Sequence, residues 1–157
     1  MAFAKDLLAQ SFLLLNKETK NPKQASLRRA VSTAHYALFH LLIDEAVSQW
    51  AVERQRNRLA RTFEHDGMKR KCAEVVKRVK DGTYLPVELN TVAHNFVQLQ
   101  ELRHIADYDN SMRWSRADVN IVLTLATDAF DAWSAIGAQD DAQDFLLQLL
   151  FPKLPRQ

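Results

Sequence analysis

The sequence predicts an all-α protein, an up-and-down antiparallel bundle of four to five helices with an additional C-terminal helix. Only 3 Gly and 4 Pro occur among the 157 residues, whereas an all-β domain of this size needs many turn residues. Long runs rich in Ala, Leu, Lys, Glu and Gln fill the intervals, and these residues favour helices. A hydrophobic fraction of 47% is sufficient for one core. We therefore expect a single domain over residues 1–157.

Hydrophobic periodicity and turn residues place six helical segments along the chain. The first covers about 2–19 and ends before Asn21 and Pro22. The second covers about 24–55 and ends in a charged, exposed stretch. Its buried stripe is apolar and repeats at helical spacing: Leu27, Val31, Ala34, Leu38, Leu41 and Leu42. The third begins near Asp66 or Gly67 and stops at Gly82.

The remaining three segments complete the predicted bundle. The fourth covers about 86–107, with Pro86 at a favourable position in its first turn. The fifth starts at a capping box, Ser115 to Asp118, and continues to Gly137. The sixth covers about 139–151 and is too apolar to remain exposed. It must dock either on its own bundle or on a second copy of the chain.

Composition and charge limit the class of protein. Cys72 is the only cysteine, so the chain has no intramolecular disulfide. The sequence shows neither a signal peptide nor the roughly 18 consecutive apolar residues of a membrane span, so we expect a cytoplasmic protein with no membrane partner. Residues 54–80 hold ten Lys or Arg against three acids, although the net charge is only +2. This basic segment is either a solvated helix face or a surface for a polyanion such as RNA.

Polar residues of the second segment indicate a half-buried groove. With a turn of 100° per residue, four of them fall on one line opposite the apolar stripe: Arg29, Thr33, Tyr36 and His40. Ser32 and Asp44 flank this line. A solvated helix face usually carries Lys, Glu and Gln, and so Ser, Thr, Tyr and His predict partial burial. His40 taken alone also fits a hydrogen-bonded structural histidine.

One arginine lies within the apolar arc of the fourth segment. Arg103 shares that arc with Val92, Phe96 and Leu99, where a charge is costly unless it is paired. Asp107 lies one turn further and offers an i,i+4 partner. The pair is either a structural ion pair at a helix end or, together with the polar row, part of a pocket for an anion.

Familiar catalytic motifs do not occur in the sequence. It has no phosphate-binding glycine loop, nucleophile elbow, His-Glu-x-x-His or paired Glu-x-x-His motif, and we expect no metal and no cofactor. Acid and base candidates are confined to a few histidines: His35, His40, His65 and His104. RNA cleavage needs only an acid, a base and a cation for the phosphate, so it is compatible with these groups.

Two stretches resemble the HEPN family of prokaryotic helical-bundle domains. Residues 29–40, RAVSTAHYALFH, are similar to the Ser-Arg-Ala-Tyr-Tyr-Ala-x-Phe-His segment of that family. Residues 102–109 resemble its Arg-x-x-Ala-Asp-Tyr element, and residues 65–68, HDGM, resemble the His-x-Gly-hydrophobic turn between the two. The resemblance covers about residues 5–135.

The resemblance implies a bundle that commonly dimerises, with a cleft near the second and fourth segments. HEPN proteins include metal-independent endoribonucleases and toxins of defence modules, nucleotide-binding proteins, and noncatalytic partners of nucleotidyltransferases. Their ribonuclease motif is Arg, then four to six residues, then His. After Arg103 the corresponding positions hold Tyr108, Asp109 and Asn110. Any catalysis would therefore combine Arg103 with His40 or His65.

The expected function is RNA or nucleotide binding in this cleft, with weak or no ribonuclease activity, by a homodimeric toxin or defence-module component. The expected ligand-binding residues line the cleft: Arg29, Ser32, Tyr36, Asp107 and Tyr108. The alternative is a noncatalytic interaction or dimerisation module, for example the partner of a nucleotidyltransferase or of an antitoxin. Its apolar C-terminal helix would then recruit the partner.

Overall fold

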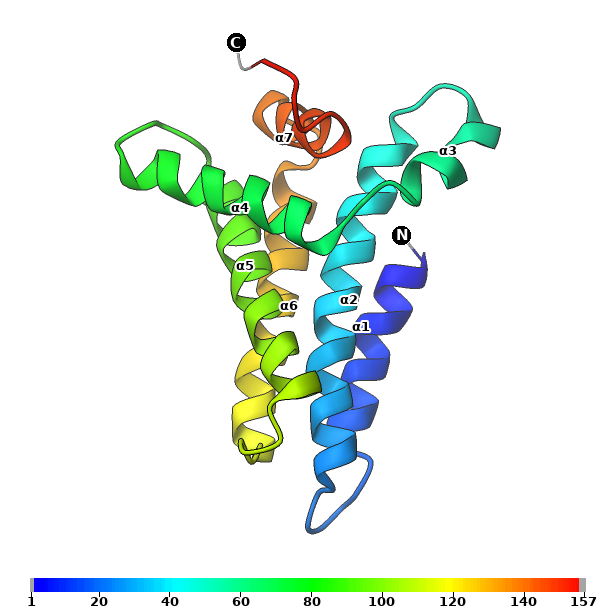
Figure 1. Ribbon diagram of the computed structural model, residues 1–157, viewed down its shortest axis with the longest axis vertical. Helices are drawn as coiled ribbons and strands as arrows, with labels where there is room; N and C mark the ends of the chain where they lie inside the picture. Colours follow the sequence, from blue (N-terminus) through cyan, green and yellow to red (C-terminus); the bar gives the residue numbers. More distant parts are fainter. Residues whose placement is uncertain (1, 156–157) are drawn as a thin grey trace.

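The computed structural model describes residues 2–155, which form seven helices and no strand. Four helices run alternately down and up as an antiparallel bundle: α1 (Ala2–Leu15), α2 (Gln24–Ser48), α5 (Val87–Tyr108) and α6 (Arg116–Ile136) (Figure 1). The other three helices lie at one end of this bundle: α3 (Glu53–Ala60), α4 (His65–Lys80) and α7 (Asp140–Leu150). The predicted fold class, a helical bundle with an added C-terminal helix, is confirmed.

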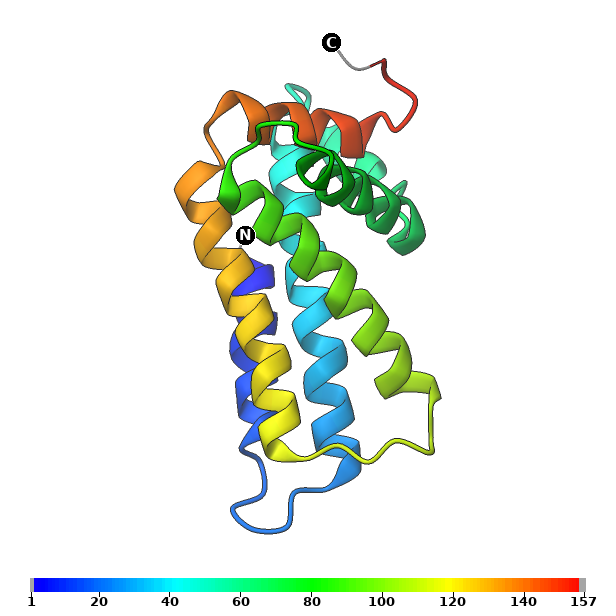
Figure 2. The ribbon, with the colours of Figure 1, turned by 90° about the vertical axis from the view of Figure 1, so that its left-hand side faces the viewer.

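The core is centred on α2, which packs against α1, α5 and α6 (Figure 2). The predicted apolar stripe of this helix is at most 2% exposed at every position: Leu27, Val31, Ala34, Leu38, Leu41 and Leu42. From α5, Leu89, Val92, Phe96 and Leu99 complete the same core. Burial of this apolar surface is the main driving force for the bundle.

The second predicted helix, 24–55, is in fact two helices. α2 ends at Ser48, and α3 begins at Glu53 in a new direction. Trp50 holds the intervening turn, because its indole Nε1 donates to Gln55 Oε1 at 2.7 Å and its carbonyl accepts from Arg56 Nε at 2.9 Å. The uninterrupted helix was therefore a wrong prediction. The charged residues of this stretch have good helix propensity, so the sequence pattern does not predict the break. The side-chain contacts at Trp50 stabilise it.

The first predicted helix, 2–19, also ends earlier than expected, at Leu15. The Asn16 side chain donates to the carbonyl of Phe12 at 3.0 Å and satisfies one of the last helical acceptors. The chain then turns through Asn21, which has a positive φ of 50°, a conformation that asparagine tolerates better than most residues. The resulting loop leads directly into α2.

The C-terminal helix α7 packs on its own bundle. Phe145, Leu146 and Leu149 are buried, and α7 contacts α2 and α4. The ring of Phe145 lies 6.4 Å from that of Trp133 in α6. Burial within the chain therefore accounts for part of the apolar composition of α7, whereas Leu147 is 41% exposed. Among residues 2–155, no single helix is long and apolar enough to span a membrane, and α6 and α7 reach such a length only together, across a bend of 116°.

The end of α5 is fastened to α2 by Arg28. Its Nη1 donates to the carbonyls of Ala106, at 2.9 Å, and Asp109, at 2.8 Å, and its Nη2 donates to the carbonyl of Met112. The last turn of α5 contains no basic residue of its own, so Arg28 supplies both hydrogen bonds and positive charge to a helix C-terminus. This contact fixes the part of α5 that carries Arg103 and Asp107.

Candidate anion-binding site

Arg103 lies where α5 faces α2. Its side chain is only 13% exposed, and its Nη1 lies 3.4 Å from Asp107 Oδ2. The predicted i,i+4 pair is therefore confirmed. The guanidinium carbon also lies 5.8 Å from the centre of the Tyr36 ring, within the range of a cation–π contact. Tyr36 thus contributes from α2 to holding the arginine.

The ion pair leaves much of the guanidinium unsatisfied. Arginine carries five N–H donors, and a 3.4 Å contact uses one of them weakly. Nε of Arg103 is buried and has no hydrogen-bond partner among the described residues. Asp107, by contrast, also accepts a hydrogen bond from the Ser32 hydroxyl. The carboxylate is thus better satisfied than the arginine, which retains capacity for an anion.

Two histidines lie beside Arg103 and form a hydrogen bond with each other. His35 of α2 is completely buried, and its Nε2 lies 3.0 Å from Nδ1 of His65, the first residue of α4. The His65 ring stacks on Phe39, with the ring centres 4.1 Å apart and an angle of 21° between the planes. Tyr36 meets the His65 ring edge to face at 5.5 Å. These contacts fix the orientation of the imidazole.

Both histidines are held in their neutral form. Burial, followed by the proximity of the second titratable imidazole, His65, and of the Arg103 charge, lowers the pKa of His35 to about 3. Burial and then the Arg103 charge lower the pKa of His65, and Asp66 partly opposes that shift. An imidazolium beside a guanidinium is unfavourable unless a negative charge lies between them. The pair is therefore sensitive to an anion that reaches Arg103.

An open groove of about 1000 Å³ separates the start of α4 from α5. Its walls are fastened by Gln100 Nε2, which donates to Asp66 Oδ1 at 2.9 Å, and by Lys69, whose Nζ lies 3.2 Å from a Glu101 oxygen. Cationic, acidic, aromatic and apolar residues line it: Phe63, Glu64, His65, Asp66, Lys69, Gln100, Glu101, Arg103, His104, Ile105 and Tyr108. Arg103 and His65 thus reach the groove from opposite walls.

The outer rim of the groove is aromatic. The rings of His104 and Tyr108 lie 4.9 Å apart, and Tyr108 is 67% exposed. Exposed aromatic rings beside a cation offer a stacking surface for a planar group such as a nucleobase. Further along α4, Arg70 and Lys80 are also exposed cations.

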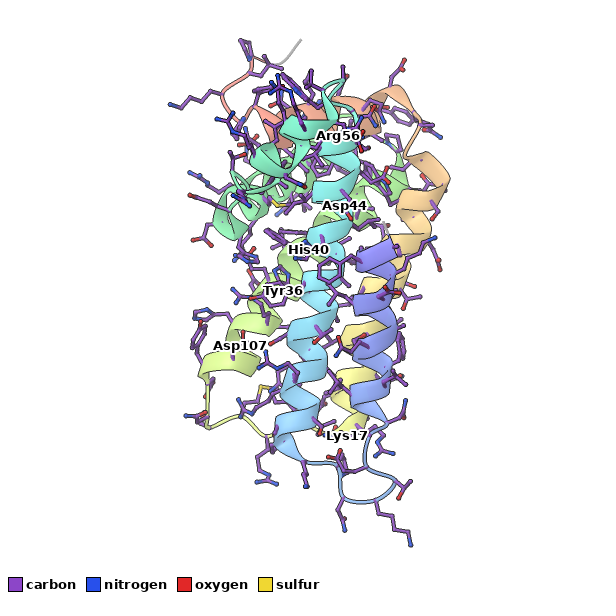
Figure 3. The ribbon with its side chains drawn as sticks, turned by 90° about the vertical axis from the view of Figure 1, so that its right-hand side faces the viewer. Lys17, Tyr36, His40, Asp44, Arg56 and Asp107 are labelled. Carbon is purple, nitrogen blue, oxygen red and sulfur yellow. The ribbon has the colours of Figure 1, made fainter. Side chains whose placement is uncertain are left out.

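The structure brings five of the predicted site residues into one cluster at the α2, α4 and α5 junction, which we call the Arg103 cluster: Ser32, Tyr36, His65, Arg103 and Asp107. Tyr108 lies at the groove rim. In Figure 3, Tyr36 and His40 follow one another along α2, and Asp107 lies on α5 at a lower level than either of them.

Two predicted site residues lie outside this cluster. His40 packs edge to face against Phe3 of α1, with the ring centres 4.9 Å apart, and does not line the groove. Arg29 is exposed, whereas its neighbour Arg28 makes the contacts to α5. The predicted polar row is therefore split: Ser32 and Tyr36 face α5, and His40 faces α1. Residues one turn apart on the same line of a helix can thus contact different neighbouring helices.

Sequence reasoning missed the two roles closest to the cluster. The sequence identifies His35 only as a possible acid or base, and its hydrogen bond to His65 depends on where α4 begins relative to α2. Arg28 carried no signal of its own, because its partners are backbone carbonyls about 80 residues away. A histidine in an otherwise apolar helical position was the one available clue to His35.

A second cavity, of about 290 Å³, lies between α4, α7 and the C-terminal segment. It combines Lys71 and Arg78 with Glu74, Asp141 and Asp144 over an apolar floor, so acidic groups outnumber basic ones. Within residues 2–155, no group of three or more His, Cys, Asp or Glu side chains is placed to hold a metal ion.

Comparisons of the chain with protein-family models, with curated proteins and with solved structures found no match.

Proposed function

We propose that the chain binds RNA or a nucleotide through a phosphate held by Arg103 in the α4–α5 groove. The observation that carries this proposal is the state of that guanidinium: it is 13% exposed, borders a groove, and is weakly paired, with a buried Nε that lacks a partner in the described part of the chain. Arginine presents a rigid fork of donors that matches phosphate oxygens. A phosphate would satisfy both the charge and the donors.

The surroundings support a nucleic-acid ligand over a simple anion. The His104 and Tyr108 rings at the rim provide a surface on which a base can stack. The exposed cations Arg70 and Lys80 on α4, together with the arginines of α3, would add to the attraction of a longer polyanion. The likeness of residues 29–40 and 102–109 to HEPN segments agrees with this assignment.

Catalysis is a narrower proposal within the same groove. Arg103 and His65 are the pair that could act on an RNA phosphate, with Arg103 stabilising negative charge and His65 transferring a proton. His40 lies outside the groove and has no such position. The homodimer and the antitoxin or nucleotidyltransferase partner stay predictions.

The alternative, a noncatalytic interaction module, rested mainly on the apolar C-terminal helix. Phe145, Leu146 and Leu149 are buried within the chain, which weakens this alternative, although Leu147 and Phe151 stay about 40% exposed. RNA or nucleotide binding is therefore the function that the geometry favours.

Binding should be detectable and salt-dependent. We expect a fluorescently labelled single-stranded oligouridylate to bind the purified chain, with an affinity that falls linearly on logarithmic axes as salt rises, because phosphate contacts release counterions. Fluorescence anisotropy over a salt series measures this slope, and unlabelled AMP as competitor shows whether a single nucleotide occupies the same groove. Absent binding, or binding insensitive to salt, would contradict the proposal.

A further inference from the structure

His65 joins the anion groove to the buried interior. It lines the groove, and its Nδ1 points inward to Nε2 of His35 at 3.0 Å. Its other ring nitrogen, Nε2, is on the opposite edge of the imidazole and is the one available to a ligand. Stacking on Phe39 and the edge-to-face contact with Tyr36 restrict rotation of the ring. A protonated His65 would therefore keep its Nδ1–H directed at His35 and its Nε2–H directed at a ligand in the groove.

The His35–His65 hydrogen bond can accommodate that proton. In the neutral pair, one hydrogen lies between the two nitrogens. If His65 becomes an imidazolium, both of its nitrogens carry hydrogen, so Nδ1–H must donate to Nε2 of a neutral His35, whose own hydrogen then resides on Nδ1. Complete burial keeps His35 neutral. Its Nδ1 makes no hydrogen bond among the described residues, so no partner there fixes one tautomer of His35. His35 is thus an acceptor that does not compete for the proton.

The charges around His65 decide when it is protonated. Arg103 opposes the imidazolium, and Asp66 favours it. An anion on Arg103 offsets the opposing charge and can accept a hydrogen bond from His65 Nε2, so it stabilises the imidazolium. The ionisable groups near His65 come from each neighbouring element: His35, Tyr36 and His40 from α2, Glu64, Asp66 and Lys69 from the start of α4, and Glu101, Arg103 and His104 from α5.

We propose that anion binding in the α4–α5 groove is coupled to the uptake of one proton by His65, with His35 as the buried neutral partner that positions it. This inference rests on the proposed function, and it adds regulation by pH to that site. Ligand binding raises the pKa of His65 relative to the free chain. Affinity therefore increases as pH falls between the bound-state and free-state pKa values, by about tenfold per pH unit where one full proton is taken up. Outside this window the affinity is constant.

The test is isothermal titration calorimetry of oligouridylate binding in two buffers of different ionisation enthalpy at the same pH. Phosphodiesters keep a constant charge across the neutral range, so any proton taken up belongs to the protein. We expect uptake by the wild type on the acidic side of neutrality and no uptake by His65→Gln. His94→Gln is the matched control, since His94 is an exposed histidine of α5 that does not line the groove, and this variant should take up protons like the wild type.

The outcomes of this experiment separate the proton coupling from the proposed binding function on which it rests. Binding by the wild type without proton uptake, or uptake that survives His65→Gln, overturns the coupling and leaves the proposed function standing. Failure of the oligouridylate to bind at every pH overturns both. A His35→Gln variant that folds, as circular dichroism would show, should bind with reduced uptake and a shifted pH profile, whereas a purely structural His35 would change stability and leave the uptake unchanged.

Discussion

Replacement of Arg28 by Ala should destabilise the fold by about 2–3 kcal/mol. Three backbone carbonyls, those of Ala106, Asp109 and Met112, would lose a charged donor, and hydrogen bonds to charged groups are among the stronger contributors to stability. The cost includes the loss of a positive charge at the C-terminus of α5, which has no basic residue in its last turn. Urea denaturation followed by circular dichroism gives the change in the free energy of unfolding.

The adjacent arginine provides a matched control for this prediction. Arg29→Ala removes the same side chain from the next position of α2, where it is exposed, and should change stability by less than about 0.5 kcal/mol. Equal effects of the two substitutions would mean that Arg28 does not fasten α5 to α2.

Replacement of Arg103 by Ala should weaken RNA or nucleotide binding by about tenfold to a hundredfold, the value of one charge-assisted phosphate contact. The fold should survive. Asp107 keeps the hydrogen bond from Ser32, and its side chain is 27% exposed, so water can replace the lost arginine. We expect a stability cost of roughly 1 kcal/mol, as for other partly exposed ion pairs. Anisotropy and urea denaturation, performed on the same preparation, separate the two effects.

Two control variants sharpen the interpretation of that result. Arg103→Lys retains the charge but loses the fork of donors, so it should bind more weakly than wild type and more tightly than Arg103→Ala. Arg29→Ala should bind within about twofold of wild type, because Arg29 does not line the groove. A loss of stability of several kcal/mol in Arg103→Ala with unchanged binding would instead show that the arginine is purely structural.

Most of the fold could be predicted from the sequence because it follows from local patterns. The stripe of α2 repeats at helical spacing, and the capping box at Ser115 is present as expected, with the Ser115 side chain accepting from the Asp118 amide. The errors occurred where side chains override propensity. The break between α2 and α3 depends on the Trp50 and Arg56 hydrogen bonds, and no periodicity carries that information.

The candidate site was predictable in part. The Arg103–Asp107 pair follows from spacing on one helix, and it formed as expected. Contacts between helices were harder to predict from the sequence, because they depend on the angles at which the helices cross. Ser32 and Tyr36 reach α5, whereas His40, one turn beyond Tyr36 on the same predicted line, packs on Phe3 of α1. The hydrogen bond between His35 and His65 could not be foreseen, since it requires the first residue of α4 to lie beside α2 at one particular level.

The most direct test of the central claim is where a nucleotide binds. Titration of the isotopically labelled chain with oligouridylate, followed by amide chemical shifts, should perturb residues 63–69 and 100–108 on the two walls of the α4–α5 groove. The Arg103 Nε–H signal should shift with them, because that group lacks another partner in the described chain. Shifts confined to the cavity between α4 and α7, or no shifts at concentrations where RNA is in excess, would contradict an anion site at Arg103.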